Sequence, residues 1–403
     1  MKTIKTIIVL LAAALLAWAL PWCYAFVCSE PQESPLTLYS CVTHDFATFS
    51  FEGHDDAAGY DPAGNPYTER QFDSIMPTVF TRRLAEEGRL PERIDGIPFD
   101  AREVELSNFV FRASPSELNR PQIGLYQLLE SAPDREGFRT PDDVFRITER
   151  GIEFVKMADN RIDAEKSERF DRVMKKKGFV FPARRIAGNA STYKHYDNGY
   201  LLLDATGTPF QMKQLCGRPF VRRIERPDSV TFTYAFVTEF PDKRLLGFLG
   251  DDRGGIHALE ADYSLHCLPL HPVDLRRERL IVVGDCFYWT AITERQGFER
   301  LTALNARDYS LAAEHETDFP APKWEQTRKY LFPFRLVFTA SSDKYIKPRL
   351  RDFSYLALGL NTLLAAGWAV YSMKKRRCRT IRVLGILVLG IYLLVPLLLT
   401  DRE

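Results

Sequence analysis

The sequence predicts a mainly β fold: a propeller-like array of β-hairpin blades with helical insertions, joined to three transmembrane helices. Two observations predict it. Through residues 144–352, hairpin-like segments begin at intervals of 41 to 56 residues, which is close to the spacing of β-propeller blades. In addition, three long segments near the chain ends carry no charged residue, as is typical of membrane-spanning helices.

The first uncharged segment lies at the N-terminus. It begins after Lys2 and Lys5, and Thr6–Ser29 contains no ionisable Asp, Glu, Lys, Arg or His. Aromatic residues gather at its far end, as they do at a membrane–water interface. We predict an N-terminal transmembrane anchor over residues 6–27. The alternative is a cleaved signal peptide with Ala17-Trp18-Ala19 as its cleavage site, and both interpretations place residues 30–352 outside the cytoplasm.

Two further uncharged segments lie near the C-terminus. Phe353–Met373 has 21 residues without a charge, and Val383–Thr400 has 18. We predict transmembrane helices over 353–373 and 383–400, joined by a cytoplasmic loop over 374–382, because short basic loops stay inside the cell. Neither helix contains an ionisable group, so we interpret both as anchors rather than a transport pathway. We expect the polar side chain of Asn361 to form a hydrogen bond between two helices.

The exported segment between the anchors is slightly acidic. Residues 30–352 carry 45 basic and 51 acidic side chains, a net charge of −6. This balance argues against a surface for nucleic acid or anionic lipid. We divide the segment into an α+β N-terminal region over 30–143 and a propeller-like β region over 144–352.

Five places in the exported segment show the pattern of a β-hairpin, with a polar turn between alternating apolar residues. They begin near residues 145, 201, 246, 287 and 336. Leu201–Met212 is the clearest, and Ile147–Phe154 recurs with one insertion as Ile292–Glu299. A further turn is expected at 341–343. A β-sandwich or a twisted meander would show the same local pattern, so only the spacing favours a propeller.

Helices are predicted at two places in the exported segment. Thr68-Glu69-Arg70-Gln71 has the pattern of a capping box and opens a helix that ends at Gly88. Pro77 lies inside this helix and should kink or split it. Ala164–Lys177 shows the apolar stripe of a second helix. The other local predictions are strands over Pro35–Phe51 and Glu103–Arg112 and a turn over Asp61–Asn65.

A set of short motifs resembles a known family. The motifs are Tyr60–Tyr67, Gln71-Phe72-Asp73, Met76-Pro77, Lys166-Ser167 with Phe170, Gly178–Ala183 and Tyr196–Tyr200. Together they resemble a bacterial family of uncharacterised membrane-anchored proteins, domain of unknown function 4857, over most of residues 30–350. The resemblance implies an N-terminal span, a large exported domain, C-terminal spans and an accessory role beside ABC-transporter components. It brings no catalytic residues.

Few residues suggest chemistry. The best metal candidate is His266–His271, in which Cys267 and His271 would share one face of a strand, with His257 and Cys286 nearby in sequence. Zinc and copper sites need more ligands than this strand face supplies, so we favour a structural strand with a buried thiol. The sequence contains no nucleophile, phosphate-loop or dinucleotide motif. We assign no catalytic, cofactor-binding or metal-binding residue.

Other polar clusters have structural interpretations. Asp251–Gly255 lacks the ligand series of a calcium loop and fits a hairpin turn. Lys175-Lys176-Lys177 fits a helix C-terminus, where cations are favoured. Glu149 and Glu153 belong to the repeated hairpin pattern, and His54-Asp55-Asp56 fits a solvated loop.

The cysteines divide by expected compartment. Cys378 lies in the predicted cytoplasmic loop and should stay reduced, whereas exported cysteines can form disulfides. Cys28–Cys41 and Cys267–Cys286 are the closest exported pairs in sequence. Spacing alone cannot determine pairing, and buried free thiols are the favoured interpretation.

We expect a non-enzymatic, membrane-anchored exported accessory subunit of a membrane complex. An ABC-type transporter, with its ATPase and permease, is the candidate partner; the lipid bilayer surrounds the anchors, and no cofactor or nucleic acid is expected. The expected location is the inner membrane, as a multi-pass protein with a large periplasmic domain. Two alternatives stay open: an envelope enzyme with its site in a propeller funnel, and an extracytoplasmic ligand sensor.

Overall fold

The computed structural model describes residues 2–29, 36–50, 58–134, 137–338, 343, 345–374 and 380–400. The chain divides into two compact units. The β unit contains residues 35–118 and 122–317, and the helical unit contains residues 1–34, 119–121 and 318–403. The predicted loop His54-Asp55-Asp56, most of the 341–343 turn and Cys378 lie outside the described residues.

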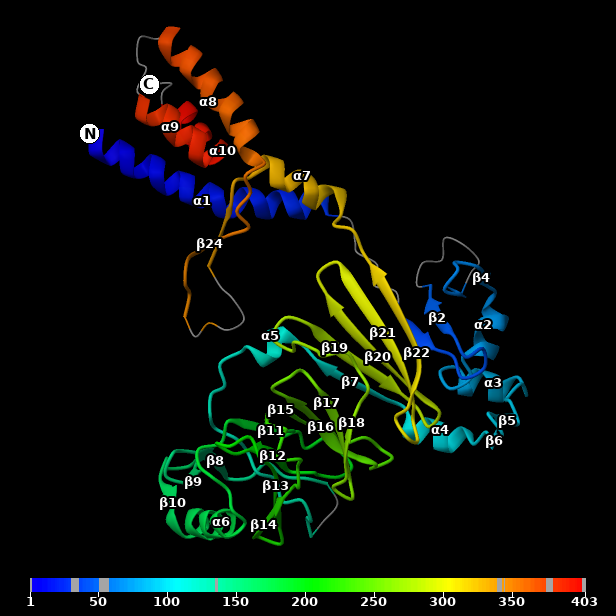
Figure 1. The fold of residues 1–403 in the computed structure, drawn as a ribbon. Helices are drawn as coiled ribbons and strands as arrows, with labels where there is room; N and C mark the ends of the chain where they lie inside the picture. The colour runs from blue at the N-terminus through cyan, green and yellow to red at the C-terminus, as the bar shows by residue number, and fades with distance from the viewer. Residues whose placement is uncertain are drawn as a thin grey trace. The chain divides into compact units, whose positions relative to one another are not determined.

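From residue 143 on, the β unit contains four small antiparallel sheets that follow one another along the chain (Figure 1). Two further sheets lie in residues 36–98. The first of the four contains β8 (Asp143–Ile147), β9 (Ile152–Lys156) and β10 (Ile162–Asp163). The second contains β11 (Arg185–Gly188), β12 (Tyr200–Leu203), β13 (Pro209–Leu215) and β14 (Arg218–Arg223). The third contains β15 (Phe232–Val237), β16 (Leu245–Asp251), β17 (Ile256–Glu260) and β18 (Leu265–Cys267). The fourth contains β19 (Arg279–Gly284), β20 (Tyr288–Arg295), β21 (Phe298–Asn305) and β22 (Leu311–Asp318), with β7 (Phe109–Ala113) beside β19.

All five predicted hairpins are confirmed as antiparallel pairs. Four of them, β8–β9, β12–β13, β16–β17 and β20–β21, belong to the four sheets just described. The fifth, formed by β23 (Arg335–Val337) and β24 (Arg349–Arg351), belongs to the helical unit instead. The expectation that all five hairpins share one array is therefore wrong for the last of them.

Apolar clusters join each sheet of the series to the next. The first cluster connects the β8–β10 sheet and helix α6 (Ala164–Lys176) to the β11–β14 sheet. The second connects the β11–β14 sheet to β15–β17. The third connects the β15–β18 sheet to β7, β19 and β20. Their fully buried members include Phe154 and Phe210 in the first, Leu203 and Phe232 in the second, and Phe248 and Leu280 in the third. Successive apolar clusters thus join these sheets in chain order.

Residues 36–118 carry most of the short elements. They are β1 (Thr37–Tyr39), β2 (Phe46–Phe49), β3 (Gly59–Tyr60), β4 (Pro66–Tyr67), α2 (Glu69–Ile75), α3 (Thr81–Glu86), β5 (Arg93–Ile94), β6 (Ile97–Pro98) and α4 (Ala101–Ser107); the four-residue helix α5 (Pro115–Leu118) follows β7. The capping box at Thr68 is confirmed, and the helix is split around Pro77 as predicted.

The strand predicted over residues 103–112 is wrong in its first half, where α4 forms. Asp100 caps this helix, because its side chain accepts hydrogen bonds from the backbone N–H groups of Arg102 and Glu103. Strand β7 begins only at Phe109. The segment predicted as one strand over 35–51 is the β1–β2 hairpin, and the second predicted helix is confirmed as α6.

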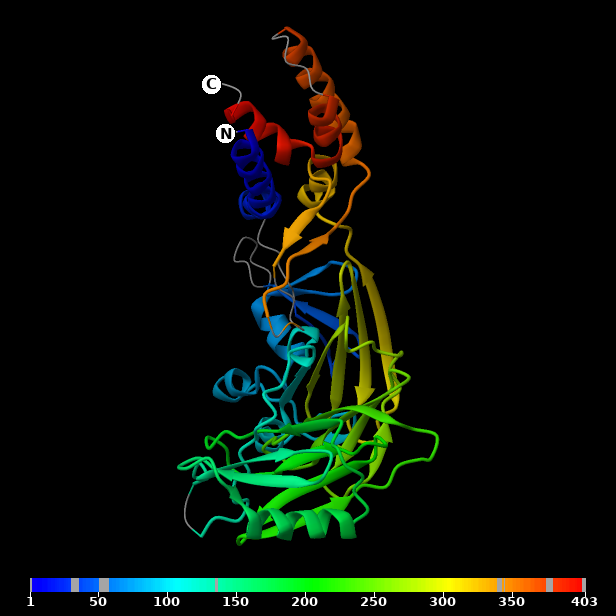
Figure 2. The same ribbon diagram turned by 90° about the vertical axis from the view of Figure 1, so that its left-hand side faces the viewer.

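The helical unit contains α1 (Lys2–Cys28), α7 (Lys323–Leu331), α8 (Ala357–Lys374), α9 (Thr380–Leu389) and α10 (Ile391–Thr400). Helix α10 packs against α1, and α9 packs against α8 (Figure 1 and Figure 2). Their shared apolar cluster includes Val9, Ala365, Trp368, Ile386 and Leu397.

The structure corrects the prediction of three transmembrane helices. Among the described helices, only α1 is long and apolar enough to cross a membrane. The segment predicted over 383–400 breaks at Gly390, where φ is +55°, into two helices of 10 residues each. A helix of this length covers only about half of the hydrocarbon layer. The predicted hydrogen bond of Asn361 is confirmed, because its side chain reaches α9 at this break.

Candidate functional site

Two features of the β unit share the segment between β15 and β16, residues 238–244. One is a cluster of buried charged side chains around Lys194, called the charge cluster below. The other is a cavity. Segment 238–244 supplies a carboxylate to the charge cluster and two charged side chains to the cavity wall.

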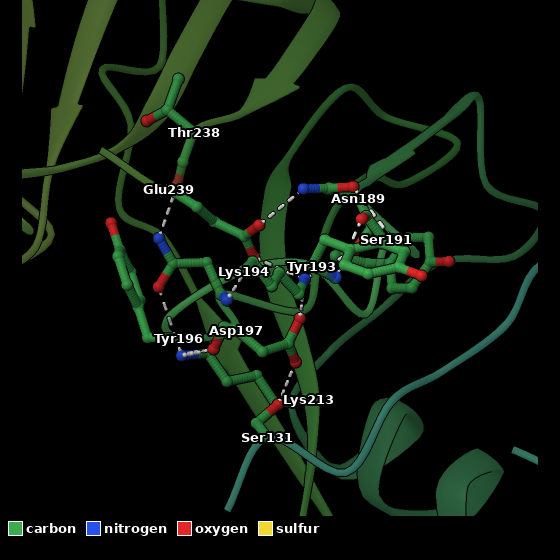
Figure 3. Close-up of polar contacts among 12 residues, drawn as sticks. Ser131, Asn189, Ser191, Tyr193, Lys194, Tyr196, Asp197, Lys213, Thr238 and Glu239 are labelled. Atoms are coloured by element: carbon green, nitrogen blue, oxygen red, sulfur yellow. Dashed lines mark hydrogen bonds and ion pairs between the residues drawn. The ribbon is translucent and has the colours of Figure 1, made fainter. Parts of the chain in front are cut away.

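Lys194 lies at the centre of the charge cluster (Figure 3). Its Nζ donates hydrogen bonds to Oδ1 of Asp197 at 2.5 Å, to Oε1 of Glu239 at 2.8 Å and to the carbonyl of Asn189 at 2.6 Å. An ammonium group has three donors, so all of them are used. The side chains of Lys194, Asp197 and Glu239 are only 5%, 2% and 6% exposed. Charges buried to this degree are stable only when they are paired and hydrogen-bonded.

A second lysine balances the two carboxylates. Lys213, on β13, donates from Nζ to the carbonyl of Asp197 at 3.1 Å and to Oδ1 of Asn198 at 3.4 Å. Burial lowers the pKa of Lys213, while the carboxylates of Asp197 and Glu239 oppose this shift. Ser131 donates to the second carboxylate oxygen of Asp197 (Figure 3). With both lysines protonated, the cluster carries no net charge.

The motif Tyr196–Tyr200 attaches the charge cluster to the neighbouring sheet. Asn198 donates from Nδ2 to the carbonyl of Thr238 at 2.7 Å, and its backbone N–H donates to Oε1 of Glu239 at 2.9 Å. The hydroxyl of Tyr196 donates to the carbonyl of Phe240 at 2.7 Å. These bonds join the loop before β12 to segment 238–244. The charge cluster therefore positions this segment between two sheets.

The cavity bordered by segment 238–244 has a volume of about 530 Å³. Helix α4, strand β7 and the turn from β19 to β20 supply its other walls. Its lining includes the aromatic side chains of Phe109, Phe287 and Trp289, the acidic side chains of Asp100, Glu103, Asp242 and Asp285, the arginines Arg102, Arg244 and Arg307, and Cys286. The volume and the mixture of aromatic and polar walls are typical of sites for small molecules.

Arg244 is held firmly at the cavity wall. Its guanidinium donates to Oε1 of Glu260 at 3.0 and 3.2 Å, to the hydroxyl of Tyr309 at 2.9 Å and to the carbonyl of Ala306 at 2.5 Å. Burial works against ionisation of Glu260, but hydrogen bonds from Tyr309 and Arg244 outweigh it and lower the pKa of Glu260. The positive charge of Arg244 is thus already balanced within the protein.

Burial raises the pKa of three other groups that line the cavity. Burial raises the pKa of Asp242 and of Asp285, although Asp285 accepts hydrogen bonds from the backbone N–H groups of Phe287 and Tyr288. Burial and the nearby Asp285 raise the pKa of the Cys286 thiol to about 12. Because the thiolate is the reactive form of cysteine, Cys286 is not an activated nucleophile at neutral pH. The arrangement suits binding through hydrogen bonds and aromatic contacts.

The structure separates the residues of the predicted metal candidate. Strand β18 ends at Cys267, so His271 is not on the strand, and its Nε2 lies 3.6 Å from Oε2 of Glu314. His257 lies opposite Cys267 on β17, and its Nε2 is 3.0 Å from Oδ2 of Asp251. Within the described ranges, no three His, Cys, Asp or Glu side chains are grouped as metal ligands.

The other sequence candidates occupy structural positions. Asp251–Gly255 is the turn between β16 and β17, as predicted, and Asp251 accepts hydrogen bonds from two backbone N–H groups within it. Lys175–Lys177 lies at the C-terminal end of α6, also as predicted. Glu153 forms an ion pair with Arg146 at 2.6 Å. The six cysteines among the described residues are free thiols, but only Cys41 is buried. Cys267 of β18 is exposed, so the prediction of a buried thiol on that strand is wrong.

Sequence reasoning missed both the charge cluster and the cavity. Lys194 and Asp197 are near each other in sequence, but Lys213 lies on another strand and Glu239 follows β15 of the next sheet. The available signal is the polar motif Tyr196–Tyr200, which leads into the buried strand β12 and contributes to the sequence analysis only as a family motif.

Comparison with family models now connects this site to known sequences. The model described as "Domain of unknown function (DUF4857)" matches residues 36–304, about two thirds of the chain. The chain belongs to this family. The match confirms the resemblance seen in the sequence, and the whole charge cluster lies inside the DUF4857 region. No curated protein matches the chain.

Solved structures offer only distant likenesses. The chain is similar to the "Structure of Dos1 propeller" with a TM-score of 0.27 and 10% identity, over 44% of this chain and 45% of that one. It is also similar to PorZ, a surface component of the type-IX secretion system of Porphyromonas gingivalis, with a TM-score of 0.23 and 10% identity, over 71% of this chain and 32% of that one. The chain thus spans less than half the length of either structure.

Proposed function

We propose that this DUF4857 protein is a membrane-anchored accessory subunit of a membrane complex, with its β unit outside the cytoplasm. An ABC-type transporter, with its permease and ATPase, is the proposed partner, and the inner membrane is the proposed location. The observation that carries the proposal is the apolar outer surface of the helical unit.

Large apolar side chains lie exposed along these helices. Ile8, Leu11 and Leu15 of α1 are each more than half exposed, as are Leu363 of α8 and Leu384 of α9. Extended apolar surfaces of this kind are rare on soluble monomers. Lipid or the helices of a partner would cover them. Helix α1 has the length to cross the bilayer by itself, so anchoring does not require the C-terminal helices.

Helix α8 supports contact with a partner's helix. An added Cβ at Gly359 or Gly367 would have no neighbouring atom within 4 Å. Leu363, midway between these glycines, is 71% exposed. Residues four apart lie on one side of a helix, so the three form an open strip. Small residues allow close helix contact in lipid.

The double variant Gly359→Leu, Gly367→Leu tests this proposal. Because both sites are open in the chain itself, we expect unchanged thermal unfolding in detergent. In a mild-detergent pulldown from native membranes, we expect partner recovery to fall about tenfold, equivalent to about 1.4 kcal/mol. Leu384→Phe, at an exposed position of α9, is the matched control and should retain partners. Full recovery with the double variant would contradict contact through α8. If the wild-type chain recovers no membrane protein, the accessory role itself is contradicted.

The cavity supports a second candidate function, binding of a small extracytoplasmic ligand. Its volume and its mixture of aromatic and polar walls favour binding, and the raised pKa of the Cys286 thiol argues against Cys286 as a nucleophile. A thermal-shift screen with small polar metabolites tests it. We expect a stabilising compound whose effect is lost in Asp242→Leu and retained in Asp262→Leu, an exposed turn position outside the cavity. An equal loss in both variants would contradict binding at the cavity.

A further inference from the structure

Cys41 and Cys286 are 245 residues apart in sequence, yet neighbouring contacts bring them together. The rings of Tyr39 and Tyr288 lie 4.9 Å apart, and the backbone N–H of Tyr39 donates to Oγ1 of Thr290 at 2.9 Å. Cys41 is two residues after Tyr39, and Cys286 is two residues before Tyr288. Cys41 lies in the turn that follows β1, and Cys286 lies in the bend between β19 and β20. The contacts of Tyr39 with Tyr288 and Thr290 therefore hold this turn beside this bend.

Burial and electrostatics support the same placement. Both cysteines belong to one apolar cluster with Ile94, Val104 and Phe287. Burial raises the pKa of Cys41 most strongly, and Asp285 and Cys286 add smaller effects of the same sign. Cys41 is 4% exposed, whereas Cys286 is partly exposed and lines the cavity.

We propose that Cys41 and Cys286 form a disulfide when the folded chain meets a disulfide-containing oxidant. The bond would connect the β1–β2 hairpin to the turn between β19 and β20, next to the cavity. Neither sequence spacing nor the predicted pairs Cys28–Cys41 and Cys267–Cys286 indicate this partnership. Its formation in cells rests on the proposed exported location, because disulfides persist in oxidising compartments.

The reaction proceeds in two exchanges. The Cys286 thiol loses its proton, and its sulfur attacks one sulfur of a small disulfide formed by two monothiols, such as oxidised glutathione. This attack releases one thiolate and leaves a mixed disulfide on Cys286. Cys41 then loses its proton and attacks the Cys286 sulfur, releasing the second thiolate. The two protons end on the two released thiols, so two protein thiols and one disulfide become one protein disulfide and two small thiols. The cavity admits the oxidant to Cys286, and the buried Cys41 acts second.

Peptide mapping of the purified full-length chain in detergent tests the pair. After incubation with oxidised glutathione, we expect a linked Cys41–Cys286 peptide, while the exposed Cys216 carries glutathione. In Cys41→Ser, the mixed disulfide should accumulate on Cys286. Because the thiol pKa of Cys286 is about 12, the rate of closure should rise about tenfold per pH unit near neutrality. A persistent glutathione adduct on Cys286 in the wild-type chain, equal to that in Cys41→Ser, would overturn the proposal.

Thiol trapping in cells separates this inference from the proposed location. Alkylation at the moment of lysis, followed by the same mapping, should find the pair oxidised if the β unit is exported. A pair that closes in the purified chain but is reduced in cells would contradict export and leave the pairing intact. A reduced pair in both experiments would contradict the pairing itself.

Discussion

Asn361 of α8 donates a hydrogen bond from Nδ2 to the backbone carbonyl of Leu387 in α9, with a separation of 3.1 Å. This carbonyl lies in the last turn of α9, where the helix ends and the left-handed Gly390 follows. A helix end leaves carbonyls without an intrahelical partner, and a fully buried amide side chain supplies one here. A Cβ at position 390 would lie 2.0 Å from Oδ1 of Asn361, so the glycine and the asparagine fit together.

Replacing Asn361 should destabilise the helical unit. In Asn361→Leu, the carbonyl of Leu387 loses its donor in an apolar environment, at a cost of about 1–2 kcal/mol. Thermal unfolding in detergent micelles should show a lower midpoint. Thr362→Val is the control, because Thr362 is exposed and bonds only within its own helix. Equal midpoints for the two variants would contradict this role of Asn361.

Lys194→Met should strongly destabilise the β unit. It removes the cation between Asp197 and Glu239 and leaves two buried carboxylates underpaired, at a cost of about 3–5 kcal/mol in urea unfolding. Adding Glu239→Gln should recover part of this loss. Arg172→Met removes an ion pair in which both side chains are 71% exposed, and it should cost less than about 1 kcal/mol. Comparable costs for Lys194→Met and Arg172→Met would show that the charge cluster does not position segment 238–244.

Gly199 and Gly217 offer a matched pair for backbone strain. Both have positive φ, at +68° and +71°, but a Cβ at Gly199 would lie 2.3 Å from the carbonyl oxygen of Met212, whereas Gly217 has open space. Gly217→Ala should cost about 1–2 kcal/mol for its left-handed backbone alone. Gly199→Ala should cost clearly more, because the motif before β12 must move. Urea unfolding of both variants measures the difference, and similar costs would contradict close packing at Gly199.

Asp285→Asn should change the pH dependence of stability. The pKa of Asp285 is raised above its ordinary value of 3.8, so its stabilising contribution is present below about pH 4 and is lost as the pH rises through the folded pKa. An asparagine keeps the acceptor oxygen without ionising. The variant should therefore exceed the wild type in stability at pH 7, and the gap should shrink toward pH 4.

Asp308→Asn should change the pH dependence of stability in the opposite direction. Hydrogen bonds from Ser310 lower the pKa of Asp308, so its contribution is present above the ordinary pKa and is lost as the pH falls. This variant should be less stable than the wild type at neutral pH, with a gap that closes in acid. Chemical unfolding of the wild type and of both variants, from neutral to acidic pH, measures these differences in stability. Parallel curves for Asp285→Asn and the wild type would contradict a raised pKa at Asp285.

The sequence by itself determined the features that depend on neighbouring residues. The capping box at Thr68, the split around Pro77, helix α6 and the five hairpins follow from periodicity, capping and turn residues within short windows. The apolar helix α1 follows from an uninterrupted uncharged segment. The family follows from short motifs that are present in this single sequence. In each of these cases the interactions that decide the structure lie within one continuous stretch of the chain.

Only the tertiary structure decided what the site contains. Lys194 meets Glu239 because two sheets pack together, and Arg244 meets Tyr309 across 65 residues of chain. The helix break at Gly390 depends on Asn361 of another helix. The apolar segment 383–400, whose composition predicts one transmembrane helix, therefore forms parts of two short helices. Cys41 shares an apolar cluster with Cys286 and not with a cysteine closer in sequence. Buried charges, carbonyls and thiols interact with whichever groups the fold brings next to them. These groups are distant in the sequence, so the residues near each buried group do not identify its partner.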